Sequence, residues 1–203
     1  MSTKALTWLA GPRTMQSRSE EVETFVPGRA DSFHKLIDAY QNRVYGFVRR
    51  MVPNSEDAED ITQEVFIRAY QNFDRYDARA SIRTWLFRIA YNLCVDRARK
   101  VGRGLQQVSL QVNPEIEDEI DVPDTRWQPD TLLENEEFKS RVERAIEAMS
   151  EKLRSVLLLH DREDMSYEEI SGALGIPIGT VKSRLFLART HLQHAVKDLV
   201  EGK

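Results

Sequence analysis

Residues 165–175 constrain the fold more than any other stretch, because they specify both ends of one short helix. Positions 166–169 read Ser-Tyr-Glu-Glu, a capping box in which the serine and glutamate side chains each bond the other residue's backbone amide. Met165 and Ile170 occupy the two positions of a hydrophobic staple around this start. Gly175 follows the helix, and glycine accepts the left-handed backbone conformation of a tight exit.

A second helix is expected directly after this turn, opened by Pro177 and Thr180. Its apolar positions recur every three or four residues and form one buried stripe: Val181, Leu185, Ala188, Leu192, Val196 and Leu199. Its opposite face presents Lys182, Ser183, Phe186, Arg189 and Lys197. Two helices joined by a short glycine turn, the second with a basic face, are typical of a helix-turn-helix in the DNA major groove.

Side chains near the start of this helix suit contacts with DNA. Lys182 and Arg184 can bind guanine edges or phosphates, and Ser183 can bind either. Phe186 can contact a thymine methyl group. The alternative is an ordinary pair of antiparallel helices with a solvated basic face, which the spacing alone leaves open.

The rest of the chain also predicts helices and shows no strand-like alternation. Residues 33–51 form one amphipathic stretch that Pro53 ends, and Asn54 offers an N-cap for the next helix. That next helix should bury Ile61, Val65, Phe66, Ala69, Tyr70 and Phe73. A third should turn inward Leu86, Ile89, Ala90, Leu93 and Cys94. Two further helices should carry Phe138, Val142, Ile146 and Met149, then Leu153, Val156, Leu157 and His160.

Residues 79–103 combine seven basic side chains with one acidic side chain, a net charge of +6, and interleave aromatic rings. Cations follow phosphates, and aromatic faces stack on unpaired bases at about 1–3 kcal/mol each. Such a helix suits holding open DNA strands. It is equally consistent with core rings, such as Trp85 and Phe87, beneath a solvated basic face.

Between the two modules, residues 104–130 carry seven carboxylates against Arg126, a net charge of −6, with three prolines. This composition predicts an extended linker that can span roughly 85–90 Å at ~3.3 Å per residue. Residues 1–29 show no sustained period and predict a flexible leader. We therefore expect an all-α protein with two small helical domains, 30–103 and 131–203, joined by an acidic linker.

Several classes of protein are disfavoured. A single cysteine, Cys94, forms no internal disulfide, and no apolar run approaches the ~20 residues of a membrane helix, so we expect a cytoplasmic protein. His191 and His194 have no third metal ligand nearby in sequence, and no catalytic motif appears, so we expect no enzyme and no cofactor. The remaining alternative is a helix-turn-helix regulator that dimerises or senses a ligand.

Four stretches resemble the extracytoplasmic-function (ECF) sigma factors of bacterial RNA polymerase. They are DAEDITQEVFIRAY at 57–70, RTWLFRIAYN at 83–92, SYEEI at 166–170 and GTVKSR at 179–184. The resemblance covers roughly residues 30–200 in the family's order. It implies an alternative sigma factor that binds core polymerase, recognises the −35 and −10 promoter elements and promotes strand opening.

The resemblance also implies roles for individual residues of the 30–103 module, as sigma domain two. The residues implied to dock on the beta-prime clamp helices are Asp60, Gln63, Glu64 and Arg68. The residues implied to recognise and open the −10 element are Tyr76, Ser81, Ile82, Arg83, Trp85, Arg88 and Asn92. Ile82 and Leu86 stand where housekeeping factors tend to carry aromatics, which implies weaker melting.

The 131–203 module resembles sigma domain four. The residues that the resemblance implies to contact the −35 element are Tyr167, Glu168, Thr180, Lys182, Ser183, Arg184, Phe186 and Arg189. Leu187 and His160 stand where some relatives carry arginine. The family further implies contact with the beta flap, an anti-sigma partner, and a linker that either threads the polymerase cleft or acts as a plain tether.

Overall fold

The structure is a computed structural model that describes residues 30–76, 80–102 and 136–200. Every regular element within these ranges is a helix, so the expected all-α class with two helical domains is confirmed. The expectations for the leader (1–29) and the acidic linker (104–130) lie outside the described residues. So does most of the loop between Tyr76 and Ser81.

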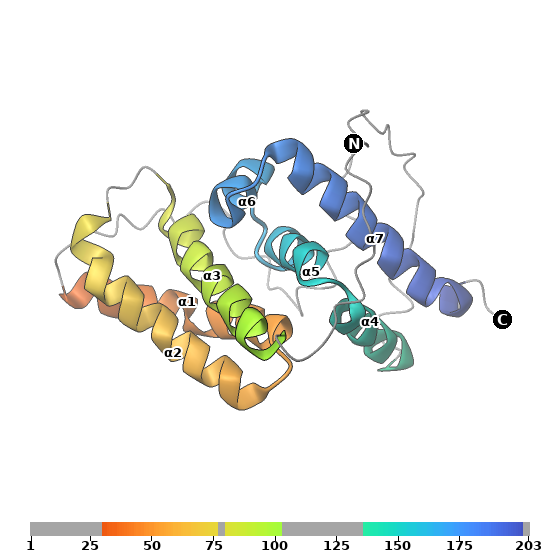
Figure 1. Cartoon of the computed structure of the whole chain (residues 1–203), viewed down its shortest axis with the longest axis horizontal. Helices are drawn as coiled ribbons and strands as arrows, with labels where there is room; N and C mark the ends of the chain where they lie inside the picture. The colour runs from red at the N-terminus through yellow and green to blue at the C-terminus, as the bar shows by residue number, and fades with distance from the viewer. Residues whose placement is uncertain (1–29, 77–79, 103–135, 201–203) are drawn as a thin grey trace.

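The first domain consists of three helices that pack around one core (Figure 1). They are α1 (Ala30–Met51), α2 (Ser55–Asn72), which continues into the 3-10 turn η2 (Phe73–Arg75), and α3 (Ile82–Gly102). Asn54 caps α2 as expected, because its side-chain oxygen accepts a hydrogen bond from the Glu56 amide at 2.8 Å. Phe47 of α1 meets Phe87 of α3 edge to face, with ring centroids 5.4 Å apart.

The second domain contains four helices and ends in the predicted helix-turn-helix. They are α4 (Glu136–Ala148), α5 (Glu151–Leu157), α6 (Tyr167–Leu174) and α7 (Ile178–Val200), with a π-helical turn, η3 (Leu158–Arg162), after α5. The capping box is confirmed: Ser166 Oγ accepts from the Glu169 amide at 3.2 Å, and Glu169 accepts from the Ser166 amide at 3.0 Å. Gly175 ends α6 at φ +66°, in the left-handed region that favours glycine.

The predicted buried stripes are mostly confirmed, with five exceptions. Tyr70 is 63% exposed, although its ring and the Phe33 ring meet edge to face with centroids 5.0 Å apart. Phe66, Ile89, His160 and Leu199 are only partly buried. Cys94 is buried as expected.

The two domains lie against each other. In Figure 1, α3 of the first domain runs beside α6 of the second, and α1 contacts both α4 and α5. The structure thus places the predicted −10 helix against the predicted DNA-binding module.

Candidate nucleic-acid interface

Helix α3 presents one face toward α2 of the first domain and another toward α6 of the second domain. Trp85, Ile89 and Asn92, spaced four and three residues apart, lie on one face toward α2. Arg83 and Thr84 lie on the other face, toward α6. The residues predicted for the −10 element therefore divide into two groups.

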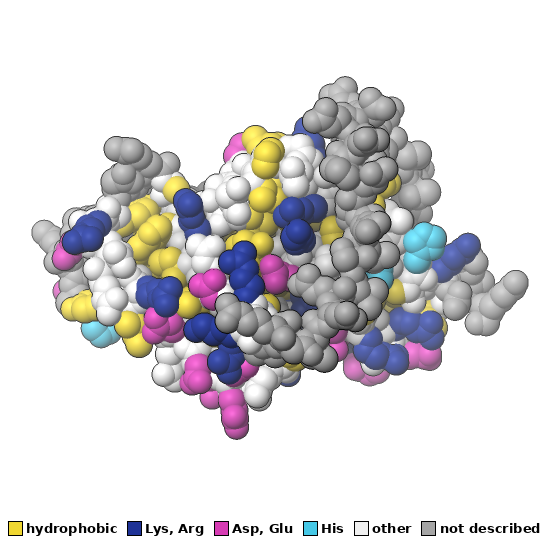
Figure 2. Space-filling model, viewed as in Figure 1, with side chains coloured by type: hydrophobic (Ala, Val, Ile, Leu, Met, Phe, Trp, Pro, Cys, Tyr) yellow, Lys and Arg dark blue, Asp and Glu magenta, His cyan; other side chains and the backbone are white. Residues whose placement is uncertain are grey.

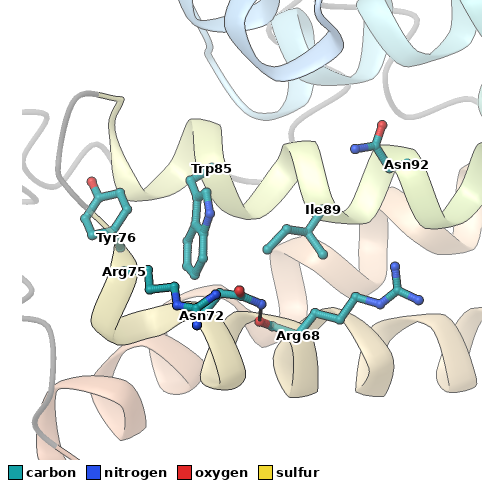
Figure 3. A pocket seen from close by; sticks show the side chains of 7 residues that line it. All are labelled: Arg68, Asn72, Arg75, Tyr76, Trp85, Ile89 and Asn92. Atoms are coloured by element: carbon teal, nitrogen blue, oxygen red, sulfur yellow. Dashed lines mark hydrogen bonds between the residues drawn. The ribbon is translucent and has the colours of Figure 1, made fainter.

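The first group lines a groove of about 330 Å³ between α2 and α3. Its walls are Arg68, Asn72, Arg75, Tyr76, Trp85, Ile89 and Asn92 (Figure 3). Figure 2 shows hydrophobic side chains gathered on this side of the first domain with Lys and Arg side chains around them. Tyr76, Trp85 and Asn92, all predicted for the −10 element, thus share one concave surface.

Two aromatic rings form one end of this groove. The Tyr76 and Trp85 rings are tilted by 38° with centroids 5.3 Å apart, and both are partly buried. The Tyr76 hydroxyl donates a 2.6 Å hydrogen bond to the Ala80 carbonyl, which ties the end of η2 to the start of α3. A fixed, partly exposed ring can stack on an unpaired base.

Cations lie around the same groove. Arg68 and Arg75 are both exposed, and Arg68 Nε donates to Glu64 Oε1 at 2.7 Å. The side-chain amide of Asn72 donates to the backbone carbonyl of Arg68 at 2.9 Å, so the two residues lie one turn apart on the same side of α2. Rings flanked by cations are the combination that binds single-stranded nucleic acid.

The sequence did not assign Asn72, Arg75 and Ile89 to this groove. It placed Arg68 on the polymerase-docking face, whereas the structure places Arg68 beside the −10 residues. Ile89 was assigned to the core, but it is only partly buried and lines the groove. The four-residue spacing from Arg68 to Asn72 was the available signal, but only the packing angle of α2 and α3 reveals their common wall.

The second group of predicted −10 residues points elsewhere. Ser81 and Arg83 bind Glu169 of α6, with Arg83 Nη2 at 2.5 and 2.6 Å from the two carboxylate oxygens. Ile82 is partly buried against the core, and Arg88 is exposed. These four residues do not line the groove.

The outer face of α2 carries the residues predicted to dock on polymerase. Asp60 and Gln63 are exposed, and Glu64 is partly buried in its ion pair with Arg68. Ile67 and Tyr70 are also exposed, by 50% and 63%, which is unusual for large apolar side chains. Solvent-exposed apolar side chains with polar neighbours are a mark of protein-binding surfaces.

The helix-turn-helix presents a mixed surface. Lys182 and Glu168 are exposed, whereas Thr180, Ser183, Arg184 and Phe186 are partly buried. Hydrogen bonds with its own backbone and with Ser166 lower the pKa of Glu168, and the nearby charge of Lys182 lowers it further. The first turn of α6 and the start of α7 therefore face the same side.

Arg189 and Tyr167 differ from the expectation of freely presented DNA contacts. Arg189 Nη2 lies 2.7 Å from Oδ1 of buried Asp161, and His160 Nδ1 lies 2.6 Å from the same oxygen. The His160 ring packs on the Tyr167 ring with centroids 5.4 Å apart. The reason is the buried carboxylate, which holds the guanidinium against the scaffold.

Other candidate sites gain no support. Burial raises the pKa of Cys94 to about 12, so the thiol stays protonated at neutral pH and is a poor nucleophile. The described residues contain no group of three His, Cys, Asp or Glu side chains placed to hold a metal ion. Within the same ranges, no helix is long and apolar enough to cross a membrane.

Comparison with known proteins connects these surfaces to one family. The sigma-70 region 2 family matches residues 36–104, and the sigma-70 region 4 family matches residues 139–192. The chain is 33% identical over 184 residues to the ECF RNA polymerase sigma factor SigW of Bacillus subtilis, a match that covers 85% of this chain and 92% of SigW. The chain belongs to the ECF group of sigma-70 family factors. It is an alternative sigma factor that acts in transcription initiation.

A further relative supports the assignment of this ECF sigma factor, and two solved structures share its fold. The Escherichia coli K12 sigma-E factor is 34% identical over 182 residues, which cover 88% of this chain and 94% of sigma-E. RpoE of Bartonella quintana, solved with the anti-sigma factor NepR, shares the fold with a TM-score of 0.61 at 24% identity, over 82% of this chain and 98% of RpoE. CnrH, solved with the cytosolic domain of CnrY, has a TM-score of 0.59 at 22% identity, over 84% of this chain and 90% of CnrH.

Proposed function

We propose that this sigma factor uses the groove between α2 and α3 to hold the unpaired strand of the −10 element. The observation that carries this assignment is the groove itself, in which Trp85 and Tyr76 stand beside the exposed cations Arg68 and Arg75. A volume of about 330 Å³ lies at the lower end of the ~300–1,000 Å³ typical of small-ligand sites. The groove thus suits one flipped base rather than a duplex. Base-flipping proteins likewise hold a single base outside the stack in a pocket.

The outer face of α2 is proposed to bind core RNA polymerase at the beta-prime clamp helices. Exposed Ile67 and Tyr70 supply the apolar centre that a stable interface needs, and Asp60 and Gln63 supply its polar rim. Arg68, at the boundary between this face and the groove, would lie between polymerase and DNA. The second domain is proposed to contact the beta flap.

The start of α7 is proposed to read the −35 element. Lys182 is exposed, and Thr180, Ser183 and Arg184 lie beside it on the first turns of the recognition helix. Arg189 and Tyr167 act here through the scaffold, since Asp161 and His160 hold them. Their contribution is to set the position of the first turns relative to the DNA.

The remaining assignments follow from the family and from charge. A net charge of −4 opposes phosphate binding, so the isolated protein should bind promoter DNA weakly and gain specificity only with core polymerase. We place the protein in the cytoplasm, without catalytic activity of its own. The complex of RpoE with the anti-sigma factor NepR supports the proposal that an anti-sigma partner also binds this factor.

The test is run-off transcription by bacterial core polymerase, with and without this protein, across genomic promoters. We expect new transcripts whose start sites share −35 and −10 sequences. A variant with Ile67→Glu and Tyr70→Glu should lose co-elution with core on a sizing column while keeping its helical circular dichroism. Transcription that is identical with and without the protein, or no co-elution of the wild type with core, would refute the proposed function.

A further inference from the structure

A carboxylate lies buried within the domain that carries the helix-turn-helix. Asp161 belongs to the π-helical turn η3, and its side chain is only 3% exposed. This wide turn is closed by a hydrogen bond from the Glu163 amide to the Leu158 carbonyl, five residues back, at 3.2 Å. Isolated π-helical turns are frequent at functional sites. A buried carboxylate is unfavourable unless it is paired, so its partners indicate its role.

Two donors converge on one oxygen of this carboxylate. Arg189 Nη2 of α7 lies 2.7 Å from Asp161 Oδ1, and His160 Nδ1 lies 2.6 Å from the same atom. Because a carboxylate only accepts hydrogen bonds, the His160 ring carries its proton on Nδ1. Arg189 Nη2 is also 3.2 Å from Nδ1, so the guanidinium and the imidazole reach the oxygen side by side. Asp161 thereby fixes both side chains.

Stability alone does not account for this ion pair. Asp161 Oδ2 and Arg189 Nε are buried and have no hydrogen-bond partner within the described part of the chain. An arginine and a carboxylate bind most strongly through two parallel hydrogen bonds, whereas this pair uses one carboxylate oxygen. The desolvation of a buried ion pair often cancels its attraction, and unsatisfied atoms add to that penalty. The pair therefore calls for a role other than stabilisation.

The elements that this network joins carry residues proposed for the −35 element. Arg189 lies seven residues, about two turns, after Lys182 on the same face of α7. The His160 ring packs on the ring of Tyr167, the first residue of α6, with centroids 5.4 Å apart and planes tilted by 31°. Through its two donors, Asp161 sets how the start of α6 and the face of α7 lie relative to each other.

The same arrangement neutralises one charge of the recognition helix. The Arg189 side chain is 30% exposed, whereas its counter-ion Asp161 is 3% exposed. An arginine that is already paired within the protein adds little to the counterion release that drives binding to phosphates. Contacts with phosphates strengthen binding to every sequence, and contacts with base edges distinguish one sequence from another. Pairing with Asp161 thus favours a positioning role for Arg189 over attraction to the backbone.

We propose that Asp161 is a positioning residue for recognition of the −35 element and acts through Arg189 and His160. This role rests on the proposed reading of the −35 element by α7. Arg189 is the link by which Asp161 sets the register of α7 in the major groove, and it is not itself a phosphate contact. His160 extends the same restraint to Tyr167. Discrimination between sequences, rather than overall affinity for DNA, depends on this network.

The test measures binding of holoenzyme to two duplexes. One carries the −35 element of a promoter found by run-off transcription, and the other carries that element scrambled. The double variant Asp161→Leu with Arg189→Met replaces the ion pair by apolar side chains, an exchange that often preserves stability. Its discrimination between the duplexes should fall about fivefold or more, as for one mismatched base pair. The slope of log affinity against log salt concentration should keep its wild-type value, because no phosphate contact is lost.

A single variant releases the arginine without removing it. In Asp161→Asn, the freed Arg189 should steepen the salt slope by up to about 0.9, the value for one phosphate contact, while discrimination falls. Glu137→Gln is the matched control, since it changes the net charge equally and breaks the 3.7 Å ion pair with Arg141 on α4. The control should keep both the slope and the discrimination of the wild type. Unfolding curves establish that each variant is folded, and the double variant decides if Asp161→Asn is not.

A second measurement needs neither polymerase nor DNA. Nitrogen NMR of the full-length protein at alkaline pH reports which ring nitrogen of His160 carries the proton. We expect Nδ1 in the wild type and a loss of this preference in the double variant, because Asp161 accepts that proton's hydrogen bond. A wild-type ring protonated on Nε2 would contradict the convergence of both donors on Asp161 and overturn the proposal.

Two binding results would also overturn the positioning role. Wild-type discrimination in a folded double variant would mean that the ion pair is only structural. Equal losses on both duplexes, with a salt slope reduced by about 0.9, would make Arg189 a phosphate contact. A wild-type holoenzyme that binds both duplexes equally would instead refute the proposed reading of the −35 element and the role of Asp161 with it, so the two failures are distinguishable.

Discussion

Replacement of Trp85 tests the −10 groove most directly, because this ring forms one wall of it and contacts Tyr76. Stacking of one base on an aromatic side chain contributes about 1–3 kcal/mol, so Trp85→Ala should weaken binding of the unpaired strand by about 5- to 150-fold. The ring is only partly buried, so the free energy of unfolding should fall by less than the ~3–5 kcal/mol of a buried ring. Trp85→Phe, which keeps a flat ring, should retain most of the binding.

The assay compares two DNA molecules bound to holoenzyme. One is a fork with a single-stranded −10 element, and the other is a duplex that contains only the −35 element. Trp85→Ala should lose affinity for the fork and keep wild-type affinity for the duplex, while co-elution with core polymerase is unchanged. Equal losses on both molecules, or loss of polymerase binding, would mean that the groove does not hold the open strand.

Further predictions concern the recognition helix, the turn, the domain contact and pH. Lys182→Ala should weaken −35 binding by about 1–3 kcal/mol in a competition assay; equal loss on scrambled −35 sequences would indicate phosphate contact instead. Gly175→Ala should lower the free energy of unfolding by about 1–2 kcal/mol in chemical denaturation, because alanine is strained at φ +66° although no atom lies within 4 Å of its Cβ. The control Gly179→Ala should not destabilise the protein, because Gly179 has no such positive φ and the space around its Cβ is also open. Arg154→Met should cost at least about 1–3 kcal/mol, since Arg154 donates to four backbone carbonyls that lose their partner. Burial opposes ionisation of Glu169, but the hydrogen bonds and charge of Arg83 prevail and lower its pKa. The stability advantage of wild type over Glu169→Gln should therefore be complete above the ordinary glutamate pKa of about 4.3 and disappear as pH falls through the lower folded value; an advantage that persists at the acidic end would contradict this.

Local signals were sufficient to predict the helices and several of their ends, but not the end of α5 at Leu157, after which His160 lies in the π-helical turn η3. The capping box at Ser166, the left-handed Gly175 and the Asn54 cap depend on residues within four positions of each other, so sequence spacing fixes them. The buried stripes follow from the 3.6-residue period for the same reason. Tyr70 fits this period, yet it is 63% exposed, so the period alone does not predict how completely a side chain is covered.

The candidate site was only half predictable. The resemblance to the family assigned Tyr76, Trp85 and Asn92 to the −10 element, but their common groove with Arg68 and Arg75 depends on how α2 crosses α3. The ion pair between Arg189 and Asp161 likewise joins residues 28 positions apart in the sequence. Neither the shared groove nor this ion pair corresponds to a periodic pattern in the sequence.

The amino-acid sequence by itself determined the helices, their caps and the charge of each module, because these depend on neighbours along the chain. Only the tertiary structure decided which face of α3 lines a groove and which face meets Glu169, a residue 86 positions away. The physical reason is that the spacing of residues along α3 separates the two faces but does not say what packs against either. What distinguishes them is the element that packs against each, and that is set by long-range packing rather than by local sequence.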